Sequence, residues 1–240
     1  MSSSPARCCH PFLFRDGPHM TAYIFDSETT GLNNPELVEA AWLQLGAGLA
    51  VTGEFLQRYK PSKPIELGAL ATSHILDEDL VDCPPHDSFK LPEDATYLIG
   101  HNVDYDWGVI GKPDIKRICT KALSSMLWPD ADSHTQSAMI YLHYRAEAPE
   151  LLRNAHAALD DVKNCRRLLA AIFTSLKAQL GRPVASWEEL WEISEDARIP
   201  KVIRFGKHAG SKIEDIPRDY KRWLLGQADI DPYLRKALEK

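Results

Sequence analysis

The sequence predicts an α/β protein in which a mixed β-sheet is flanked by helices and followed by a small C-terminal α+β domain. Strand-like runs come first along the chain and then alternate with helical patterns, an order typical of such a sheet. The tripeptide Gly181-Arg182-Pro183 ends the longest helical pattern, and the residues after it carry their own tryptophans. A length of 240 residues is enough for one large domain with a smaller one appended.

Composition excludes several protein classes. Hydrophobic residues make up 44% of the chain, charged residues 26%, and the formal net charge is −6, values that do not fit collagen-like, wholly disordered or coiled-coil chains. No apolar run approaches the roughly 18 residues of a membrane-spanning helix, and no secretory signal is evident, so we expect a cytoplasmic protein without membrane contact. The five cysteines contain no CxxC pair, which argues against a disulfide scaffold or a zinc cluster.

The first twenty residues are rich in Ser, Pro, Cys and His and show no periodicity. We expect residues 1–20 to be a disordered leader, with Met20 as an alternative start, or a cloning remnant, and we exclude them from fold reasoning. Residues 21–181 are predicted to form the main domain and residues 182–240 the small C-terminal domain.

The main domain is predicted to begin as an antiparallel meander and to continue with β/α units. The expected strands are Tyr23–Asp26, Leu37–Leu45, Leu49–Tyr59, Thr96–Ile99 and Ile115–Cys119. The expected helices are Leu67–Leu80, about Asn102–Ile110, 120–127, 134–144 and 153–179. In the C-terminal domain we expect helices at Trp187–Ser194, Asp219–Leu225 and Pro232–Leu238, with a β-ribbon over Val202–Ile213.

Two carboxylates follow the first strand. Asp26 and Glu28 are two residues apart, so the period of a strand sends both side chains to the same face. Carboxylates placed in this way repel each other, and a hard divalent cation such as Mg²⁺ or Mn²⁺ is their natural partner. The competing interpretation is an ordinary turn, because Asp, Ser, Thr and Gly are all common turn residues.

A second acidic cluster, Asp104 and Asp106, comes after the short strand at Thr96–Ile99. On a helix these two side chains are about 200° apart, so only one of them can face a site at the sheet edge. The spacing leaves open which one does. Acidic residues at a helix start also have a purely structural explanation in the helix dipole.

The third cluster lies at the start of the long helix. Asp161 falls about 55° from the centre of its apolar stripe and Asp160 about 155° away, so Asp161 is the carboxylate turned toward the buried side. A neutral imidazole, with an unperturbed pKa near 6.5, can take a proton from a metal-bound water at physiological pH, which gives His156 a functional interpretation beside that of a cap or surface residue. The stripe itself is Ala158, Val162, Cys165, Leu169, Ile172 and Leu176.

Taken together, the segments D-S-E-T-T-G from Asp26, H-N-V-D-Y-D from His101 and H-A-A-L-D-D from His156 occur in this order. They resemble the three motifs of the DEDD 3′→5′ exonucleases, in the subgroup whose third motif contains a histidine. Three ordered motifs are far more specific than any one of them. The resemblance implies a ribonuclease H-like fold and makes residues 21–181 the exonuclease domain.

The resemblance also implies the site and its chemistry. The metal ligands that it implies are Asp26, Glu28, Asp106 and Asp161. It selects Asp106 over Asp104, makes His156 the general base, and implies two divalent ions, Mg²⁺ or Mn²⁺, that assist phosphodiester hydrolysis. Leu32 would press on the terminal base or, alternatively, pack inward as an apolar loop residue. The substrate-binding positions that it implies are Thr29, Gly31, Leu32 and Asn102.

Further segments look like the exodeoxyribonuclease X-type enzymes of this family, so that the resemblance covers nearly the whole chain from Met20. These segments are Arg117–Thr120, Leu127–Pro129, Arg204–Lys207 and Tyr220–Leu224. The resemblance implies an enzyme that degrades single strands and duplex 3′ ends of DNA to nucleoside 5′-monophosphates, in DNA repair or turnover. The preference for DNA comes from the resemblance alone, because relatives with the same motifs degrade RNA.

The C-terminal domain contains a basic stretch, with eight basic and three acidic residues over 198–222 and aromatic residues interleaved. Such a stretch can contact phosphates and stack on bases, and Lys207 and Arg222 are the expected DNA contacts. The alternative is that Trp223-Leu224-Leu225 forms the core of a small domain and the lysines its wet surface.

Three other functions compete with a DNA exonuclease. An RNA 3′ exonuclease would use the same motifs. A non-catalytic nucleic-acid-binding scaffold would keep the fold with a damaged ligand set, whereas all five motif positions are filled here. In an acidic α/β protein of another kind, the three clusters would not meet in space.

Overall fold

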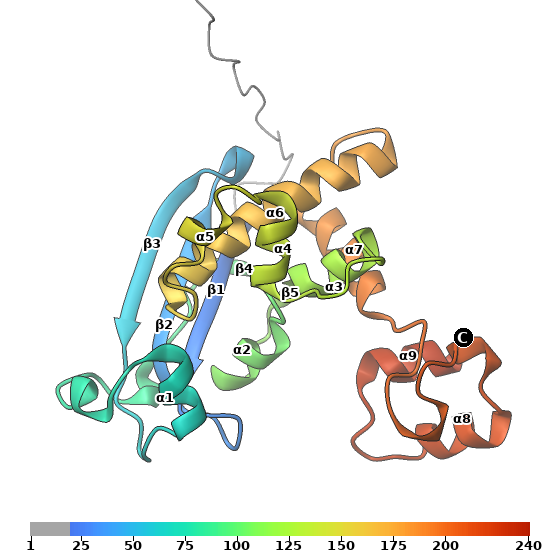
Figure 1. Cartoon of the computed structure of the whole chain (residues 1–240), viewed down its shortest axis with the longest axis horizontal. Helices are drawn as coiled ribbons and strands as arrows, with labels where there is room; N and C mark the ends of the chain where they lie inside the picture. Colours follow the sequence, from blue (N-terminus) through green and yellow to red (C-terminus); the bar gives the residue numbers. More distant parts are fainter. Residues whose placement is uncertain (1–19) are drawn as a thin grey trace, which may run out of the picture.

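A computed structural model describes residues 20–240 of the chain (Figure 1). The leader expected over residues 1–20 lies outside the described residues, apart from Met20. Within the described part, no helix is both long and apolar enough to cross a membrane.

A five-stranded mixed sheet with the order β3-β2-β1-β4-β5 forms the centre of the larger domain. The strands are β1 (Thr21–Thr29), β2 (Leu37–Leu45), β3 (Val51–Arg58), β4 (Ala95–Gly100) and β5 (Lys116–Cys119). The first three strands pair antiparallel, and β4 and β5 extend the sheet by parallel pairing. The predicted meander and the predicted mixed sheet are both confirmed, and β1 is the central strand.

Nine α-helices accompany the sheet in residues 20–240. They are α1 (Leu67–Ser73), α2 (Asp104–Val109), α3 (Thr120–Leu127), α4 (Gln136–His143), α5 (Ala148–Leu151), α6 (Ala158–Leu180), α7 (Trp187–Arg198), α8 (Arg218–Leu225) and α9 (Pro232–Glu239). The long helix was expected from residue 153 but begins five residues later, because His156 has a φ of 71° and Ala157 is extended. The helix expected over Leu67–Leu80 ends at Ser73, where His74 adopts a left-handed conformation.

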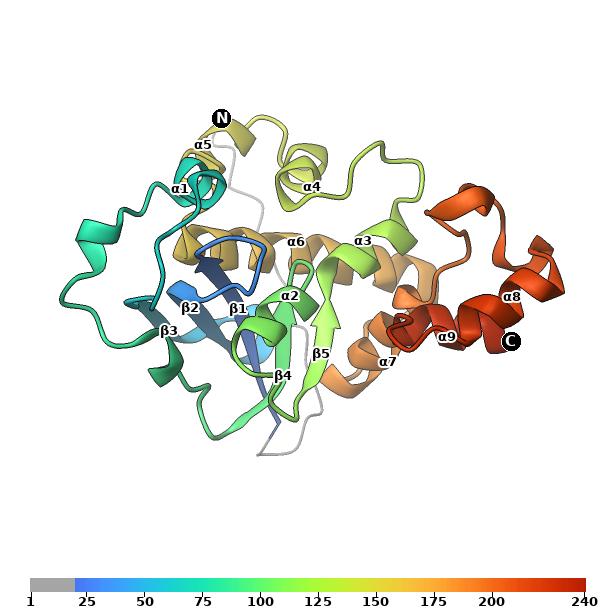
Figure 2. The same ribbon diagram turned by 90° about the horizontal axis from the view of Figure 1, so that it is seen from below.

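Helix α6 covers one face of the sheet (Figure 2). Its predicted apolar stripe is fully buried from Ala158 to Leu176 and packs against Ile24, Leu43 and Ile99 of three different strands. Burial of this stripe orients the helix, because a rotation would expose it. The first turn of α6 is thereby held beside the end of β1.

The opposite face of the sheet has a second, more aromatic core. Phe25 of β1 stacks on Phe89 with ring centroids 5.4 Å apart, and Leu98 of β4 and Val103 before α2 are buried in the same cluster. Strand β4 ends at Gly100, where a Cβ atom would lie 3.1 Å from the Phe25 carbonyl oxygen. This close approach brings the chain after β4, and with it α2, to the end of β1.

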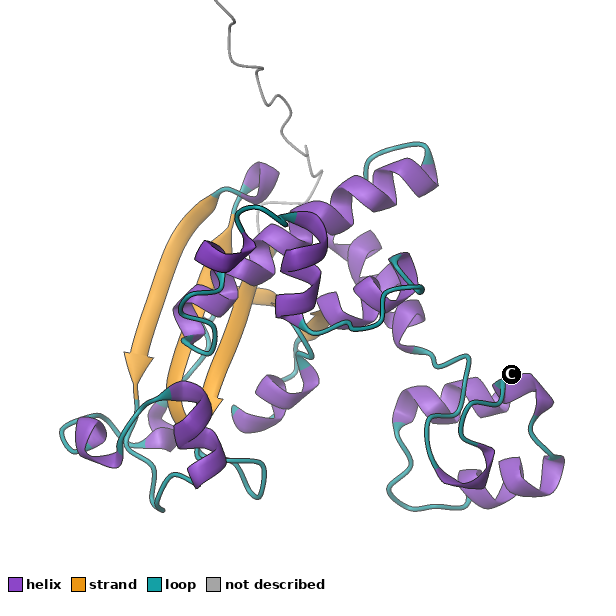
Figure 3. Ribbon diagram, in the orientation of Figure 1, coloured by secondary structure: helices purple, strands orange, loops and turns teal. Residues whose placement is uncertain are grey.

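Residues 199–240, here called the C-terminal module, have a separate apolar core. Trp187 and Leu190 of α7 belong to the main core, so the two cores divide after α7, later in the chain than the expected boundary at residue 181. The β-ribbon expected over Val202–Ile213 reduces to one antiparallel bridge between Val202 and Lys212, because the chain turns at Gly206 and Gly210. Figure 3 shows helices and loops in this module, with the strands confined to the larger domain.

Arg198, at the end of α7, connects the two parts. Its side chain is only 4% exposed and contacts Asp104 of α2 at 3.3 Å and the Arg117 carbonyl oxygen at 3.3 Å. It also donates a hydrogen bond to the Tyr233 hydroxyl of α9, which itself donates to Glu195 at 2.7 Å. One buried cation therefore joins α2, β5, α7 and α9.

We expect Arg198→Ala to loosen the C-terminal module without unfolding the main domain. Its loss leaves the Arg117 carbonyl and the Tyr233 hydroxyl without a charged donor, a change worth roughly 1.5–3 kcal/mol. Limited proteolysis should then cut faster near residues 199–202, while exposed Arg218→Ala serves as the control. Equal cleavage of the two variants would contradict this role for Arg198.

Candidate active site

Asp26 and Glu28 lie near the carboxyl end of β1, on the face that α6 covers. They are opposite Ala41 and Glu39 of β2, respectively. They therefore share a face with buried Ile24, as the period of a strand predicts. Both side chains are half-buried.

Asp106 reaches the same place from α2. It is 5% exposed, and its Oδ1 accepts hydrogen bonds from the Ser27 backbone N–H at 3.1 Å and the Ser27 hydroxyl at 2.7 Å. Ser27 stands between the two carboxylates of β1, so it fixes the third carboxylate beside them. Asp104 is instead the ion-pair partner of Arg117 and Arg198. The structure thus distinguishes the two aspartates that spacing could not.

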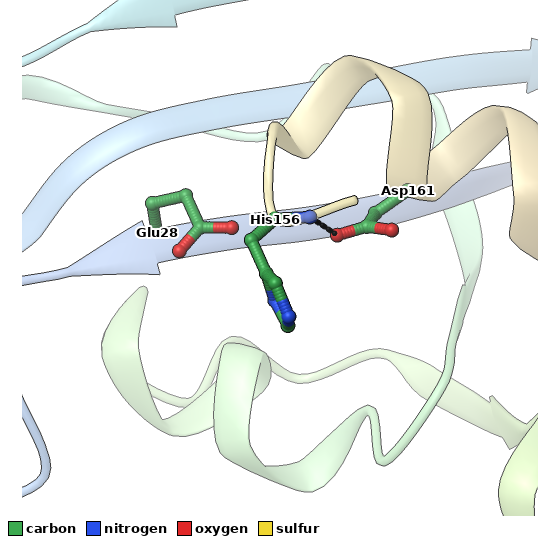
Figure 4. Close-up of side chains that lie close together, drawn as sticks. All are labelled: Glu28, His156 and Asp161. Carbon is green, nitrogen blue, oxygen red and sulfur yellow. Dashed lines mark hydrogen bonds between the residues drawn. The ribbon is translucent and has the colours of Figure 1, made fainter. Parts of the chain in front are cut away.

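Asp161 and His156 come from the start of α6 (Figure 4). Asp161 Oδ2 accepts from the His156 backbone N–H at 2.9 Å, and its Oδ1 accepts from Gln136 Nε2 at 3.0 Å. The left-handed turn at His156 directs this N–H at the carboxylate and leaves the imidazole exposed. A non-glycine residue in this conformation is strained, and such strain is often found at functional sites.

These carboxylates raise one another's pKa. Burial first and charge repulsion second raise the pKa of Glu28 to about 8, and Asp161 contributes the largest part of that repulsion among its neighbours. Burial also raises the pKa of Asp106 to about 7, against the lowering effect of its Ser27 hydrogen bonds. The pKa of Asp26 lies well above its ordinary value because of burial and then the charges of Asp106, Asp161 and Glu28. The four carboxylates therefore lie close enough together for their charges to interact.

The donor set fits a hard divalent cation. One ligand atom each from Glu28, His156 and Asp161 lies within 4.8 Å of the others (Figure 4), with the carboxylates of Asp26 and Asp106 coupled to this group by charge. Carboxylate oxygens are the ligands that Mg²⁺ and Mn²⁺ prefer. A cation among them would also relieve the repulsion that raises their pKa values. The imidazole nitrogen is near enough either to bind an ion or to take a proton from water beside one.

Sequence reasoning missed Glu39. Its Oε1 accepts a hydrogen bond from the Ala158 backbone N–H, the first of α6, at 3.2 Å, and its Oε2 pairs with Arg58 Nε at 3.0 Å. Ala157 has no side-chain acceptor with which to cap the helix, so a glutamate from β2 takes that role. A charged residue inside the apolar run Leu37-Val-Glu-Ala-Ala was the available signal, because buried charge requires partners.

The predicted substrate-binding residues divide into two groups. Thr29 ends β1, and Gly31, Leu32 and Asn102 lie on the loops that follow β1 and β4, close in sequence to the carboxylates. Lys207 and Arg222 lie on the surface of the C-terminal module, outside the carboxylate cluster.

Hydrogen bonds from two side chains hold the turn at Gly31. The Thr29 hydroxyl and the Tyr105 hydroxyl each lie 3.1 Å from its carbonyl oxygen. Its φ is 148°, and the Glu66 carboxylate occupies the position of a Cβ atom, so only glycine fits. Leu32 follows this turn and is 85% exposed, which excludes inward packing. Asn102 is exposed and left-handed, with a φ of 76°.

The structure is similar to solved structures of exonucleases. The structure of Exonuclease X in complex with 5′ overhanging duplex DNA matches with a TM-score of 0.57 and 24% identity, over 72% of this chain and 99% of that one. The fold is that of these exonucleases. Exonuclease I of E. coli with a dT13 oligonucleotide matches with a TM-score of 0.51 and 16% identity, over 68% of this chain and 42% of that one.

A 3′-exonuclease described with a histone mRNA stem-loop matches with a TM-score of 0.50 and 15% identity, over 67% of this chain and 65% of that one. No protein-family model and no curated protein matches the sequence. At these identities the likeness establishes the fold, and it confirms the expected ribonuclease H-like architecture. The chain spans less than half the length of the Exonuclease I chain.

The raised pKa values determine how stability depends on pH. Folded Glu28 and Asp106 keep protons that the unfolded chain releases, so rising pH from about 4 to about 8 favours unfolding. Without divalent metal, we expect the free energy of unfolding to fall by roughly 2–4 kcal/mol between pH 5 and pH 8. Urea denaturation in EDTA measures this. Asp26→Asn should reduce the change in unfolding free energy with pH. An unchanged pH dependence would contradict the charge interaction of Asp26 with the other carboxylates.

We expect Glu39→Ala to weaken divalent-metal binding by about 10-fold, as loss of a group that positions ligands commonly does. It frees the first N–H of α6 and so releases the turn that holds Asp161. Glu39→Gln keeps an acceptor for that N–H and should lose less. Calorimetric titration with Mn²⁺ measures the difference, with Glu78→Gln, an exposed position away from α6, as control. Equal affinity in Glu39→Ala and Glu78→Gln would contradict the role.

Proposed function

We propose that this protein is a metal-dependent 3′→5′ exonuclease that hydrolyses single-stranded DNA and duplex 3′ ends to nucleoside 5′-monophosphates. One observation carries the proposal: carboxylates from three distant segments converge at the end of β1 with an exposed imidazole beside them. A non-catalytic scaffold would not require all five groups. The fold of solved exonucleases and the order of the three motifs support the same activity.

The carboxylates would hold the metal. Asp26, Glu28, Asp106 and Asp161 supply oxygen ligands for two divalent ions, Mg²⁺ or Mn²⁺, with Asp26 central among them. Bound ions would activate water and stabilise the leaving oxygen of the scissile phosphate. The chain keeps its ligands in place through Ser27, Gln136 and the His156 backbone N–H, so they need little rearrangement.

His156 would accept the proton of the attacking water at an imidazole nitrogen. Its backbone and its side chain have separate tasks in this arrangement. The backbone N–H holds Asp161, and the exposed ring remains available to water and substrate. General-base catalysis of this kind contributes roughly 10²–10⁴-fold to a rate.

The exposed loop residues would position the strand. Leu32 projects from the turn at Gly31, where an apolar side chain can press on the terminal base. Asn102 on the facing loop can hold the strand through its amide, while Thr29 and Gly31 shape the turn. Lys207 and Arg222 would contact the DNA backbone farther along.

We assign DNA as the substrate because the motif resemblance extends to exodeoxyribonuclease X-type enzymes, and we place the activity in cytoplasmic DNA repair or turnover. RNA is the second candidate, because one solved structure of this fold is described with histone mRNA. Short DNA and RNA oligomers compared side by side distinguish the two, and faster RNA hydrolysis would favour the second.

Digestion of 3′-labelled and 5′-labelled DNA, with Mg²⁺ or with EDTA, tests the proposal. We expect a 3′ label to be released first as a mononucleotide, and no release in EDTA. Asp161→Asn should abolish the activity because the shared ions lose a ligand, whereas His156→Ala should lower kcat by roughly 10²–10⁴-fold with little change in DNA affinity.

Asp160→Asn is the matched control for Asp161→Asn. Asp160 is adjacent in sequence, but its carboxylate accepts from Asn154 at 3.1 Å rather than facing β1. Its variant should stay near wild-type activity. Turnover by Asp161→Asn within a few-fold of Asp160→Asn would rule out this site.

A further inference from the structure

The C-terminal module presents aromatic rings that its own core does not use. Phe205 is 49% exposed and Trp223 is 55% exposed. Of the run Trp223-Leu224-Leu225, Leu224 is buried in the module core and Leu225 is partly buried, whereas Trp223 turns outward. The core is filled by Ile203, Ile213, Ile216, Leu224, Leu234, Ala237 and Leu238.

The outward rings form part of a flat stack. The Trp223 ring stacks on the Tyr220 ring, with centroids 5.3 Å apart and an interplanar angle of 26°. Tyr220 also contacts His208, and the centroids of these two rings are 4.5 Å apart. Phe205 precedes Gly206, where a Cβ atom would lie 2.7 Å from the Tyr220 hydroxyl, so the chain at Phe205 runs beside this pair of rings. Apolar side chains that gather on a surface mark interaction sites more often than single ones do. We call Phe205, Tyr220 and Trp223 the aromatic face.

Cations surround the aromatic face. Lys207 Nζ lies 5.3 Å from the Tyr220 ring centroid, and Lys221 and Arg222 are neighbours of Tyr220 and Trp223 on α8. Arg222 meets Asp219 only at 3.7 Å, with both side chains almost fully exposed, so little of its charge is neutralised. Residues 199–240 contain ten basic and six acidic groups, whereas residues 1–198 contain 18 basic and 28 acidic groups.

Exposed aromatic rings with cations beside them match the chemistry of a single nucleic-acid strand. Bases stack on aromatic rings whatever their sequence, and lysine and arginine follow the phosphates. The positive charge is confined to the module, so it does not serve the solubility of a chain that is acidic elsewhere. An acidic strand is therefore the complementary ligand.

Side-chain contacts at the end of α7 also link the module to a helix beside the carboxylates. Arg198 pairs with Asp104 of α2, and the same short helix carries Asp106 two residues later. The module is thus linked through α7 and α9, whose ribbons lie side by side in Figure 2, to a helix of the candidate active site.

We propose that the aromatic face binds single-stranded DNA, through stacking on Trp223 and Phe205 and through phosphate contacts of Lys207 and Arg222. The choice of DNA rests on the proposed function, whereas the stacking surface itself does not. The face would be a second contact for a strand whose 3′ end lies at the carboxylates. Long strands would therefore bind more tightly than strands too short to reach it.

Fluorescence anisotropy with the full chain in EDTA measures this binding without turnover. The probes are fluorescein-labelled dT30 and dT4. We expect Trp223→Ala and Phe205→Ala each to weaken dT30 binding by about 5-fold or more, because a base loses its stacking partner. Trp223→Phe should retain much of the affinity. Leu180→Ala, an apolar residue 42% exposed at the far end of α6, is the control and should match wild type.

The charge contribution has its own readout. Lys207→Ala and Arg222→Ala should each reduce the slope of log affinity against log salt by about one phosphate contact. Wild-type dT30 affinity and salt slope in Trp223→Ala and Lys207→Ala would overturn the proposal. Tighter binding of rU30 than dT30 would overturn the choice of DNA, and binding to anionic phospholipid vesicles but to neither oligonucleotide would overturn the whole assignment.

Failure here is distinguishable from failure of the nuclease proposal. Binding in EDTA reports the aromatic face whether or not the chain hydrolyses DNA, and label release from dT4 reports the carboxylates. Thermal unfolding of each variant shows whether it is folded, and the exposure of Trp223 and Phe205 keeps this risk small.

Discussion

The repulsion among four carboxylates at the end of β1 is the constraint on which the rest of the site depends. Two of the groups are held by hydrogen bonds that leave them little freedom to move away: Asp106 by Ser27, and Asp161 by Gln136 and the His156 N–H. The fold therefore maintains an unfavourable charge arrangement that only protons or cations can neutralise. Such an arrangement is typical of a site prepared for its ligand rather than for stability.

Helix α2 joins the two parts of the molecule. Its two aspartates point in different directions, Asp106 to the buried Ser27 and Asp104 to the arginines that connect β5 and α7. A six-residue helix thus serves both the carboxylate cluster and the attachment of the C-terminal module. The two aspartates, Asp104 and Asp106, made the motif ambiguous in the sequence because each of them has a separate role in the structure.

Local patterns in the sequence predicted what depends on local geometry. The strand period placed Asp26 and Glu28 on one face, and the helical wheel selected Asp161. Asp106 required the family resemblance, because a helix start presents either aspartate equally well. Glu39 escaped prediction because its role depends on a contact between β2 and α6, 119 residues apart. The left-handed turn at His156 escaped it because a histidine carries no local signal for that conformation. The outward turn of Trp223 depends likewise on which residues fill the module core.

Glu39 has a consequence for how the site exchanges its ligands. Its hydrogen bond ties the first turn of α6 to β2, and the apolar core under α6 adds to that attachment, so the carboxylates have little room to move apart. The repulsion among the carboxylates must then be relieved by hydrogen ions that they retain, and not by movement of the helix away from the sheet. A divalent ion that bound among these carboxylates would displace those hydrogen ions into the solvent, so occupancy of the site would be a competition between metal and acidity.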